Sequence, residues 1–516
     1  MKFFKYIAIG AMALTGLTAC TGDLDLEPID PSQKLTLTTQ EEWDGYFARI
    51  YTTLFAGDVL SGFDGGAGSF TRVHFNLQEI VADECFISEK WGDPGYQPLN
   101  MCQWGADNQW LYAAYSRESF NVKVCAEFIK AMEEQRPQFY DDAEINSRIA
   151  EAKALRALSY YYMIDLFGKG PWVEPASVTG ATPETCERAD LFNRVVTELS
   201  QAITDIKPAA QQEFGRVSRE GARALLAKLY LNAEVYTGKG MWAECAQQCQ
   251  EIVKTINQLA PEYKYLFCAT NDKYNRGGGE LLWIVPSRNG AMDSWGGATY
   301  LTAGCYIETV PKEILTQLNA PDAWSGLRLR PELSKALEGD NRRLIYEGKF
   351  KEEIPDLGAY DEESCGYMCI KYTNTTEDDY LNEKHVGTSL NNGTAMSPTA
   401  YPIFRLSDVF LMLTECQLHG VSCDGLAYFN KVRARAGMPE ALVMPTADQL
   451  LHERQVELYM EGHRRSDLIR FGKYTGGAYN WSWKNGVLEG GAIADTRALF
   501  PIPVQYTGTI GQNPGY

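Results

Sequence analysis

Ser218–Tyr236 reads SREGARALLAKLYLNAEVY, and this stretch decides the fold class. Its apolar residues recur every three or four positions behind a serine, which is the pattern of an amphipathic helix with its N-cap. A short turn, TGKG, follows, and residues 241–258 repeat the helical pattern. Ala222, Ala227 and Ala233 are small enough to let neighbouring helices approach closely. The stretch therefore predicts an antiparallel helical hairpin.

The same periodicity recurs on both sides of this hairpin. We expect further helices at residues 41–56, 107–134, 144–167, 188–206, 406–419, 424–436 and 447–471. Helix pairs with short turns and small contact residues resemble tetratricopeptide repeats (TPRs), in which each pair buries its apolar face on the next. The prediction is an all-α fold in which TPR-like helical pairs form a scaffold.

Two segments interrupt the helical pattern. Residues 57–106 are broken, and residues 260–400 are rich in Gly, Pro, Asn and aromatic side chains. The second segment contains only short regular pieces, a predicted strand at 280–285 and a predicted helix at 311–318. Loops of this length in a compact protein usually carry function. We therefore expect long irregular loops and a few short strands to carry a ligand-binding face.

The amino terminus has the features of an export signal. Lys2 and Lys5 precede the apolar run Tyr6–Leu17, and small residues lead into Cys20. The run is too short to span a membrane, which takes about 20 apolar residues. The pattern resembles a bacterial lipoprotein signal, in which Cys20 would become the lipidated first residue. A secretory signal with a chance cysteine is the alternative.

These features predict a division of the chain. Residues 1–19 are the signal peptide, and residues 20–38 are an acidic, Pro-containing tether behind the lipidated cysteine. Residues 39–259 form an amino-terminal TPR-like helical region. Residues 260–516 form a carboxy-terminal region with the loop-rich insert at 260–400.

Composition excludes some partners. The chain has 516 residues, with 67 acidic and 48 basic side chains and a net charge of −19. This balance argues against nucleic acid, whose phosphates need basic side chains, and against electrostatic docking on anionic lipid. Membrane attachment is therefore expected through the lipid. The cysteines other than Cys20 show neither a disulfide framework nor zinc-ligand spacing, so most are expected to be small buried apolar side chains.

Motifs for catalysis are missing from the sequence. The pair His452–Glu453 begins a zinc-binding His-Glu-x-x-His motif, but position 456 is valine. No Gly-x-Ser-x-Gly nucleophile motif occurs. The adjacent carboxylates of Asp83 and Glu84 are a candidate pair for a glycoside hydrolase, but the sequence does not give the separation which that mechanism requires. We expect no catalytic residues, no metal site and no cofactor.

Aromatic side chains instead indicate a binding site. They gather in the loop segments Lys90–Trp110 and Pro286–Tyr306, next to Asn and Asp side chains. An aromatic ring can pack on the C–H face of a sugar while polar groups bind its hydroxyls. Packing within the loops is the alternative for each residue. The candidate ligand-binding residues are Trp91, Tyr96, Asn100, Trp104, Asn289, Asp293, Trp295, Tyr300 and Trp324.

Three carboxy-terminal stretches carry a family resemblance. Tyr401–Glu440 reads YPIFRLSDVFLMLTECQLHGVSCDGLAYFNKVRARAGMPE, Leu451–Tyr474 reads LHERQVELYMEGHRRSDLIRFGKY, and Phe500–Tyr516 reads FPIPVQYTGTIGQNPGY. Together they resemble the signature of the SusD/RagB family of outer-membrane nutrient-binding lipoproteins. Ala154–Gly168 and Gly215–Leu231 look like the helical half of that family. A local departure is the sequence TEC at residues 414–416, where the family usually has Ala-Glu-Ala.

The charged residues of this signature are expected to be structural. Glu453, Glu457 and Glu461 recur every four residues, which places them on one face of the predicted helix. Arginines lie nearby, at 454, 464, 465 and 470. Carboxylates and guanidinium groups interleaved in this way can tie a helix to its neighbours through charge-assisted hydrogen bonds.

The resemblance implies a function. It implies a lipid-anchored outer-membrane protein, exposed at the cell surface, that binds a nutrient glycan and delivers it to a TonB-dependent (SusC-like) transporter without covalent chemistry. The alternatives are a peptide-binding receptor of the same family, a structural subunit of the transporter and a surface glycoside hydrolase.

Overall fold

The computed structural model describes residues 37–54, 56, 66–177, 183–288, 291–292, 294–320, 322–382 and 396–516. The predicted signal, Cys20 and most of the predicted tether lie outside these residues, as do Asn289 and Asp293. Among the described helices, none combines the length and the hydropathy needed to cross a bilayer.

The helical hairpin expected from the sequence is present. It consists of α8 (Arg219–Leu231), the short α9 (Ala233–Thr237) and α10 (Trp242–Val253). The Ser218 hydroxyl caps α8 by accepting a hydrogen bond from the Gly221 N–H at 3.1 Å. The predicted helix 218–236 is interrupted at Asn232, whose side chain donates to the carbonyl of Lys228. Helices α8 and α10 pack on each other, which confirms the hairpin.

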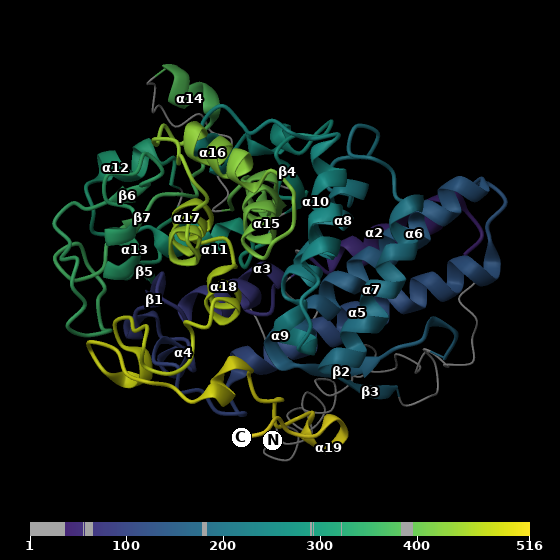
Figure 1. Cartoon of the computed structure of the whole chain (residues 1–516), viewed down its shortest axis with the longest axis horizontal. Helices are drawn as coiled ribbons and strands as arrows, with labels where there is room; N and C mark the ends of the chain where they lie inside the picture. Colours follow the sequence, from purple (N-terminus) through teal and green to yellow (C-terminus); the bar gives the residue numbers. More distant parts are fainter. Residues whose placement is uncertain are drawn as a thin grey trace, which may run out of the picture.

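Other helices extend this scaffold in the amino-terminal half. In Figure 1, α5, α6 and α7 lie together on the right, next to α8 and α10, and α5 packs along α6. The bounds are α2 (Gln40–Thr52), α3 (Phe70–Phe75), α4 (Tyr96–Asn100), α5 (Gln109–Gln135), α6 (Asp142–Tyr162) and α7 (Arg188–Ala202). Two π-helical turns, η1 (Asn76–Ile80) and η3 (Met163–Phe167), continue α3 and α6. The fold is mostly helical, as predicted.

The carboxy-terminal helices join the same scaffold through α15, which contacts both α8 and α10. Their bounds are α15 (Leu406–Leu418), α16 (Gly425–Arg435), α17 (Ala447–Leu458), α18 (Arg464–Arg470) and α19 (Thr507–Ile510). The prediction of one helix over 447–471 is wrong, since the chain breaks between α17 and α18. Met460 has φ 60° and Gly462 has φ 79°, and this left-handed backbone ends the helix.

The break has a partner in the amino-terminal half. The Glu79 carboxylate in η1 accepts hydrogen bonds from the N–H groups of Gly462, at 2.5 Å, and His463, at 2.8 Å. The Glu84 carboxyl accepts from the Met460 N–H at 2.7 Å. These bonds satisfy the N–H groups that the interrupted helix leaves without helical partners.

The loop-rich segment contains short elements, on the left of Figure 1. Its helices are α11 (Ala298–Cys305), α12 (Lys312–Gln317), α13 (Pro331–Ala336) and α14 (Glu377–Asn382). The strands of the described chain are β1 (Cys85–Ile87), β2 (Lys169–Trp172), β3 (Glu184–Glu187), β4 (Leu281–Val285), β5 (Leu327–Leu329), β6 (Ile345–Tyr346), β7 (Met368–Cys369) and β8 (Tyr401–Arg405). They form antiparallel pairs, β1 with β5, β2 with β3, β4 with β8 and β6 with β7. The predicted strand 280–285 and helix 311–318 correspond to β4 and α12.

Single helical turns complete the described secondary structure. They are η2 (Glu89–Trp91), η4 (Pro175–Ser177), η5 (Ile203–Asp205), η6 (Tyr263–Phe267), η7 (Asn271–Tyr274), η8 (Lys484–Gly486) and η9 (Asp495–Ala498).

A buried ion-pair network surrounds α17. The Glu457 carboxylate lies 2.9 Å from the Arg342 guanidinium and 2.5 Å from that of Arg405, and it also binds Arg435. Burial alone would raise the pKa of Glu457, but these three cations hold the pKa well below its usual range. Glu461 lies beyond the end of α17 but joins the network through Arg405, at 2.6 Å. The structure confirms the predicted structural role of the signature carboxylates.

Candidate ligand-binding face

The two predicted aromatic clusters meet at one place on the surface. The ring centroids of Trp91 and Trp324 are 5.9 Å apart, and those of Trp295 and Trp324 are also 5.9 Å apart. We call Trp91, Trp295 and Trp324 the tryptophan platform. The three rings come from three segments that are far apart in the sequence.

Pairing of the strands β1 and β5 brings two of these rings together. In this antiparallel pair Ile87 lies opposite Leu327. Trp91 follows β1 and Trp324 precedes β5, so both lie at the same edge of the sheet. The segment before β5 also bonds to the end of α11, since the Trp324 N–H donates to the Ala303 carbonyl at 2.7 Å.

A glycine makes room for the Trp91 ring. A Cβ atom at Gly326 would lie 1.3 Å from the nearest Trp91 ring carbon. Gly304, near the end of α11, also lies close to this ring, at 3.6 Å for an added Cβ. Because neither glycine has a side chain, the backbone at Gly326 and Gly304 can lie next to the Trp91 indole.

Trp295 occupies the outer end of the platform. Its side chain is 40% exposed, more than the half-buried Trp91 and Trp324. The turn after it is fixed by close backbone packing, because a Cβ at Gly296 would lie 2.1 Å from the Gly66 carbonyl oxygen. The Trp295 ring can therefore face solvent on a turn that is held in place.

Carboxylates anchor the indoles of the other two rings. The Trp91 indole N–H donates to Asp93 at 2.9 Å, and the Trp324 indole N–H donates to Asp322 at 2.7 Å. The same Asp93 oxygen accepts from the buried Arg72 at 2.7 Å. Sequence reasoning missed Arg72, Asp93 and Asp322. The two aspartates could have been found from the sequence, because in both loops an Asp lies two residues from a Trp. No comparable spacing marks Arg72.

Buried groups support the platform from below. The Arg72 guanidinium lies over the rings of Tyr300, Trp110 and Trp91, at 4.7, 4.9 and 5.8 Å from their centroids. It also donates to the Tyr96 hydroxyl at 2.9 Å. The Tyr300 hydroxyl donates to Asn76 in η1 at 2.7 Å. Tyr96 and Tyr300, two predicted ligand contacts, are thus interior supports and do not reach the surface.

Two further predicted contacts are also interior. Asn100 bonds to both the N–H and the carbonyl of Ile87, at 3.0 and 2.7 Å, and thereby completes the hydrogen bonding of β1. Trp104 packs on Phe500 with ring centroids 4.6 Å apart, and its indole donates to the Tyr516 hydroxyl. Their polar groups and ring faces are used within the protein. Loop packing, the alternative reading of these residues, describes their place in the structure.

The carboxylates of the candidate hydrolase pair are buried as well. Asp83 forms an ion pair with Arg464 at 2.7 Å, and Glu84 binds the backbone at the α17–α18 break. Within the described residues no group of three or more His, Cys, Asp or Glu side chains is arranged to hold a metal ion. The cysteines of the described chain are buried, which confirms the prediction that most of them are buried side chains.

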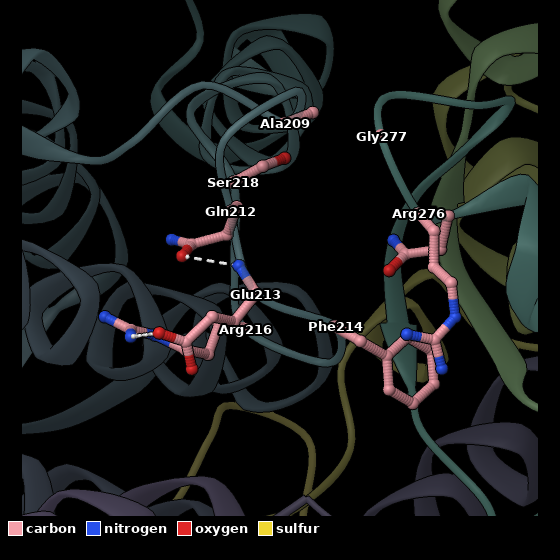
Figure 2. Close-up of a pocket in the computed structure, with 9 residues that line it drawn as sticks. Ala209, Gln212, Glu213, Phe214, Arg216, Ser218, Arg276 and Gly277 are labelled. Atoms are coloured by element: carbon pink, nitrogen blue, oxygen red, sulfur yellow. Dashed lines mark hydrogen bonds and ion pairs between the residues drawn. The ribbon is translucent and has the colours of Figure 1, made fainter.

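A separate cleft of about 140 Å³ lies between the α7–α8 connection and the segment before β4 (Figure 2). The Arg276 guanidinium stacks on the Phe214 ring at 4.0 Å and is paired with Asp272 at 3.0 Å. Arg216, on the other side, binds Glu151 at 2.6 Å. Polar side chains that line this cleft are bonded to other groups of the protein, most of them outside the lining, and none of the predicted contacts that the structure describes lines it.

A second hollow, of about 570 Å³, lies between α16 and α17. The apolar side chains of Leu442 and Val443 stand beside it and are 93% and 73% exposed. The Asn430 side chain holds this loop through two bonds to the backbone of Ala441, at 2.8 and 2.9 Å. None of the predicted contacts that the structure describes lines this hollow either.

Comparison with known proteins supports the family resemblance. Residues 349–516 match the model of the SusD family. The starch-binding protein SusD of Bacteroides thetaiotaomicron is 28% identical over an alignment of 571 positions, which covers 100% of this chain and 99% of that protein. Residues 349–516 therefore carry the features of the SusD family, and the chain is similar to SusD along its whole length.

Solved structures show the same fold. A laminarin-binding SusD-like protein superposes with a TM-score of 0.69 at 22% identity, covering 93% of this chain and 100% of that one. The surface glycan-binding protein A of Bacteroides thetaiotaomicron, solved with laminarihexaose, gives a TM-score of 0.71 at 20% identity, covering 92% and 100% of the two chains.

Proposed function

We propose that this protein binds a nutrient glycan on the tryptophan platform and performs no covalent chemistry on it. The observation that carries this proposal is the meeting of Trp91, Trp295 and Trp324, from three separate segments, at one place on the surface. An indole face packs on the C–H face of a sugar, and carboxylates at the ring edges accept its hydroxyl groups.

The angles between the rings bear on the shape of the ligand. The Trp91 and Trp324 planes are inclined by 81°, and those of Trp295 and Trp324 by 43°. Successive sugars of a straight chain present parallel faces, so they can stack on only one of these rings. The platform therefore suits a glycan that bends or branches. Two similar proteins are named for binding starch and laminarin, and these names support a glucan as the ligand.

The family resemblance also implies a membrane anchor and a transporter partner. We propose that Cys20 carries a lipid that holds the protein at the outer membrane, with residues 20–38 as its tether. The bound glycan then passes to a TonB-dependent transporter. The division into a helical region, 39–259, and a loop-rich carboxy-terminal region, 260–516, belongs to the same proposal.

Calorimetric titration of Thr21–Tyr516 tests the glycan-binding proposal. The ligands are starch, laminarihexaose and a peptide panel, with analysis of the products after incubation. We expect a glucan to bind without cleavage and Trp324→Ala to weaken binding at least about tenfold, or about 1.4 kcal/mol, because this ring contacts both of the others. Phe139→Ala, a matched control at 42% exposure, leaves binding unchanged.

The other outcomes favour the alternatives. Binding of peptides alone indicates a peptide receptor, and cleavage of a glycan indicates a hydrolase. A protein that binds nothing on the panel is better explained as a structural subunit of the transporter. Glucan binding that Trp324→Ala leaves intact places the site elsewhere.

A further inference from the structure

The two inner rings of the platform share an unusual arrangement. Trp91 and Trp324 each donate the indole N–H to an aspartate two residues away, Asp93 and Asp322. Asp93 is 42% exposed and Asp322 is also exposed. Each carboxylate therefore stands at the edge of a ring whose face we assign to the glycan, and each is open to solvent.

The charges around the rings do not balance. Arg72 is buried and neutralises Asp93, to which it is bonded at 2.7 Å. Glu89 and Lys90, both exposed next to Trp91, offset each other. Asp322 accepts hydrogen bonds from the Trp324 indole and from the Ala323 N–H, at 2.7 and 2.9 Å, and neither donor is a cation. Among the described residues around the rings, the Asp322 carboxylate therefore has no cationic partner, in a chain whose net charge is −19.

We infer that the Asp322 carboxylate makes the platform selective for neutral glycans over glycans that carry carboxylate or sulfate groups. This inference rests on the proposed function and names its substrate class. A sugar stacked on Trp324 brings its substituents to within a few ångströms of the Asp322 carboxylate. A like charge at about 6 Å in water weakens binding about threefold, and a less polar surrounding strengthens this effect.

The aspartates also have a role that does not depend on their charge. An asparagine at position 322 can still accept the indole N–H through its amide oxygen. Asp322→Asn therefore removes the charge and keeps the anchor of the ring, and of the two bonds that Asp322 accepts it gives up only the one from the Ala323 N–H. The same change at Asp93 would leave the buried Arg72 without its partner, so position 322 gives the cleaner test.

The test compares matched ligands. Maltoheptaose and laminarihexaose are titrated into Thr21–Tyr516, each as the neutral sugar and after oxidation of its C6 hydroxyls to carboxylates. The wild-type protein, Asp322→Asn and Asp205→Asn are compared at low and high salt. Asp205 is exposed in η5, so its replacement makes the same change of net charge outside the platform.

We expect the neutral sugar to bind the wild-type protein at least threefold more tightly than its oxidised form. High salt narrows this ratio, because it screens charge. Asp322→Asn also narrows the ratio, about threefold, while affinity for the neutral sugar stays within about twofold. Asp205→Asn leaves the ratio unchanged.

The inference is overturned if the ratio of the affinities for neutral and oxidised sugar changes neither with salt nor in Asp322→Asn, because the discrimination is then steric. Equal affinity of the wild-type protein for both forms overturns it as well. In both cases the neutral sugar still binds, so the proposed function stands. A wild-type protein that binds no neutral glycan overturns the proposed function and this inference together. A ratio that salt leaves unchanged in the wild-type protein overturns the inference even if the variant folds poorly.

Discussion

The ion-pair network around α17 and the tryptophan platform use carboxylates and guanidinium groups under opposite conditions. In the network, Glu457 and its three arginines are fully enclosed. At the platform, Asp93 and Asp322 bind indoles at the surface, and only Arg72 is enclosed. An enclosed charge without its partner costs several kcal/mol, whereas an exposed charge can be changed at little cost.

This difference explains why the two regions suit different tasks. The network fixes α17 against β8 and the loop that carries Arg342, and each member depends on the others. The platform is built from loop residues that are exposed or half-buried, so we expect their replacement to leave the scaffold intact. The first region therefore defines the fold, and the second is free to define the ligand.

The largest expected effect comes from breaking the network. Glu457→Ala leaves three buried guanidinium groups without their shared partner, so we expect a loss of about 3–5 kcal/mol in the free energy of unfolding. Urea denaturation measures this loss. Lys254→Ala removes an exposed ion pair to Glu251 and should change stability by less than about 1 kcal/mol. Equal effects of the two variants would contradict the contrast drawn above.

A smaller effect on stability, but a large one on binding, is expected at Gly326. Gly326→Ala puts a methyl group where the Trp91 ring lies, so the ring must move. Overpacking of this kind costs about 1–3 kcal/mol, and we expect glucan affinity to fall about tenfold as the platform is displaced. Calorimetry and urea denaturation measure the two effects. Gly45→Ala, at a helical site with open space around it, is the control. Unchanged affinity in Gly326→Ala would show that Trp91 is not part of the site.

Over a single pH unit, the pH dependence of stability gives the smallest effect. Burial, together with the nearby Glu79, holds the pKa of Glu84 well above its usual range. The folded protein therefore keeps a proton that the unfolded chain releases, so stability falls as the pH rises from about 4.5 towards the folded pKa. The slope contributed by this proton is about 1.4 kcal/mol for each pH unit.

Glu84→Gln tests this origin of the pH dependence. Glutamine can accept the Met460 N–H in place of the carboxyl and can donate to Glu79 in place of the proton. The variant should therefore lose less stability than the wild-type protein between pH 5 and pH 8, as followed by thermal unfolding. Parallel stability curves would show that Glu84 does not hold the proton. Asp83, whose pKa is lowered by its Arg464 partner despite burial, acts in the opposite direction and at lower pH.

The helices could be predicted from the sequence because their apolar residues recur with the helical period. The break between α17 and α18 could not, because it depends on bonds from Glu79 and Glu84, about 380 residues away in the sequence. The meeting of Trp91 and Trp324 depends on β1 and β5, strands of three residues each, which are too short to give a periodic signal.

The candidate site shows the same limit within a single loop. Trp91 and Tyr96 are both aromatic residues of one Pro- and Gly-containing segment, yet Tyr96 stacks on Trp110 at 4.4 Å inside the protein. The buried Arg72 decides this difference, because it binds the Tyr96 hydroxyl and lies over the Trp110 ring. The local sequence therefore predicts which side chains have the chemistry of a sugar site, but it does not predict whether each of them is exposed.

A crystal structure of Thr21–Tyr516 with maltoheptaose or laminarihexaose tests the central claim most directly. The account predicts sugar rings stacked on Trp324 and on at least one of Trp91 and Trp295, with hydroxyl groups near Asp322. A glycan bound in the cleft between Phe214 and Arg216, with the platform bare, would contradict it.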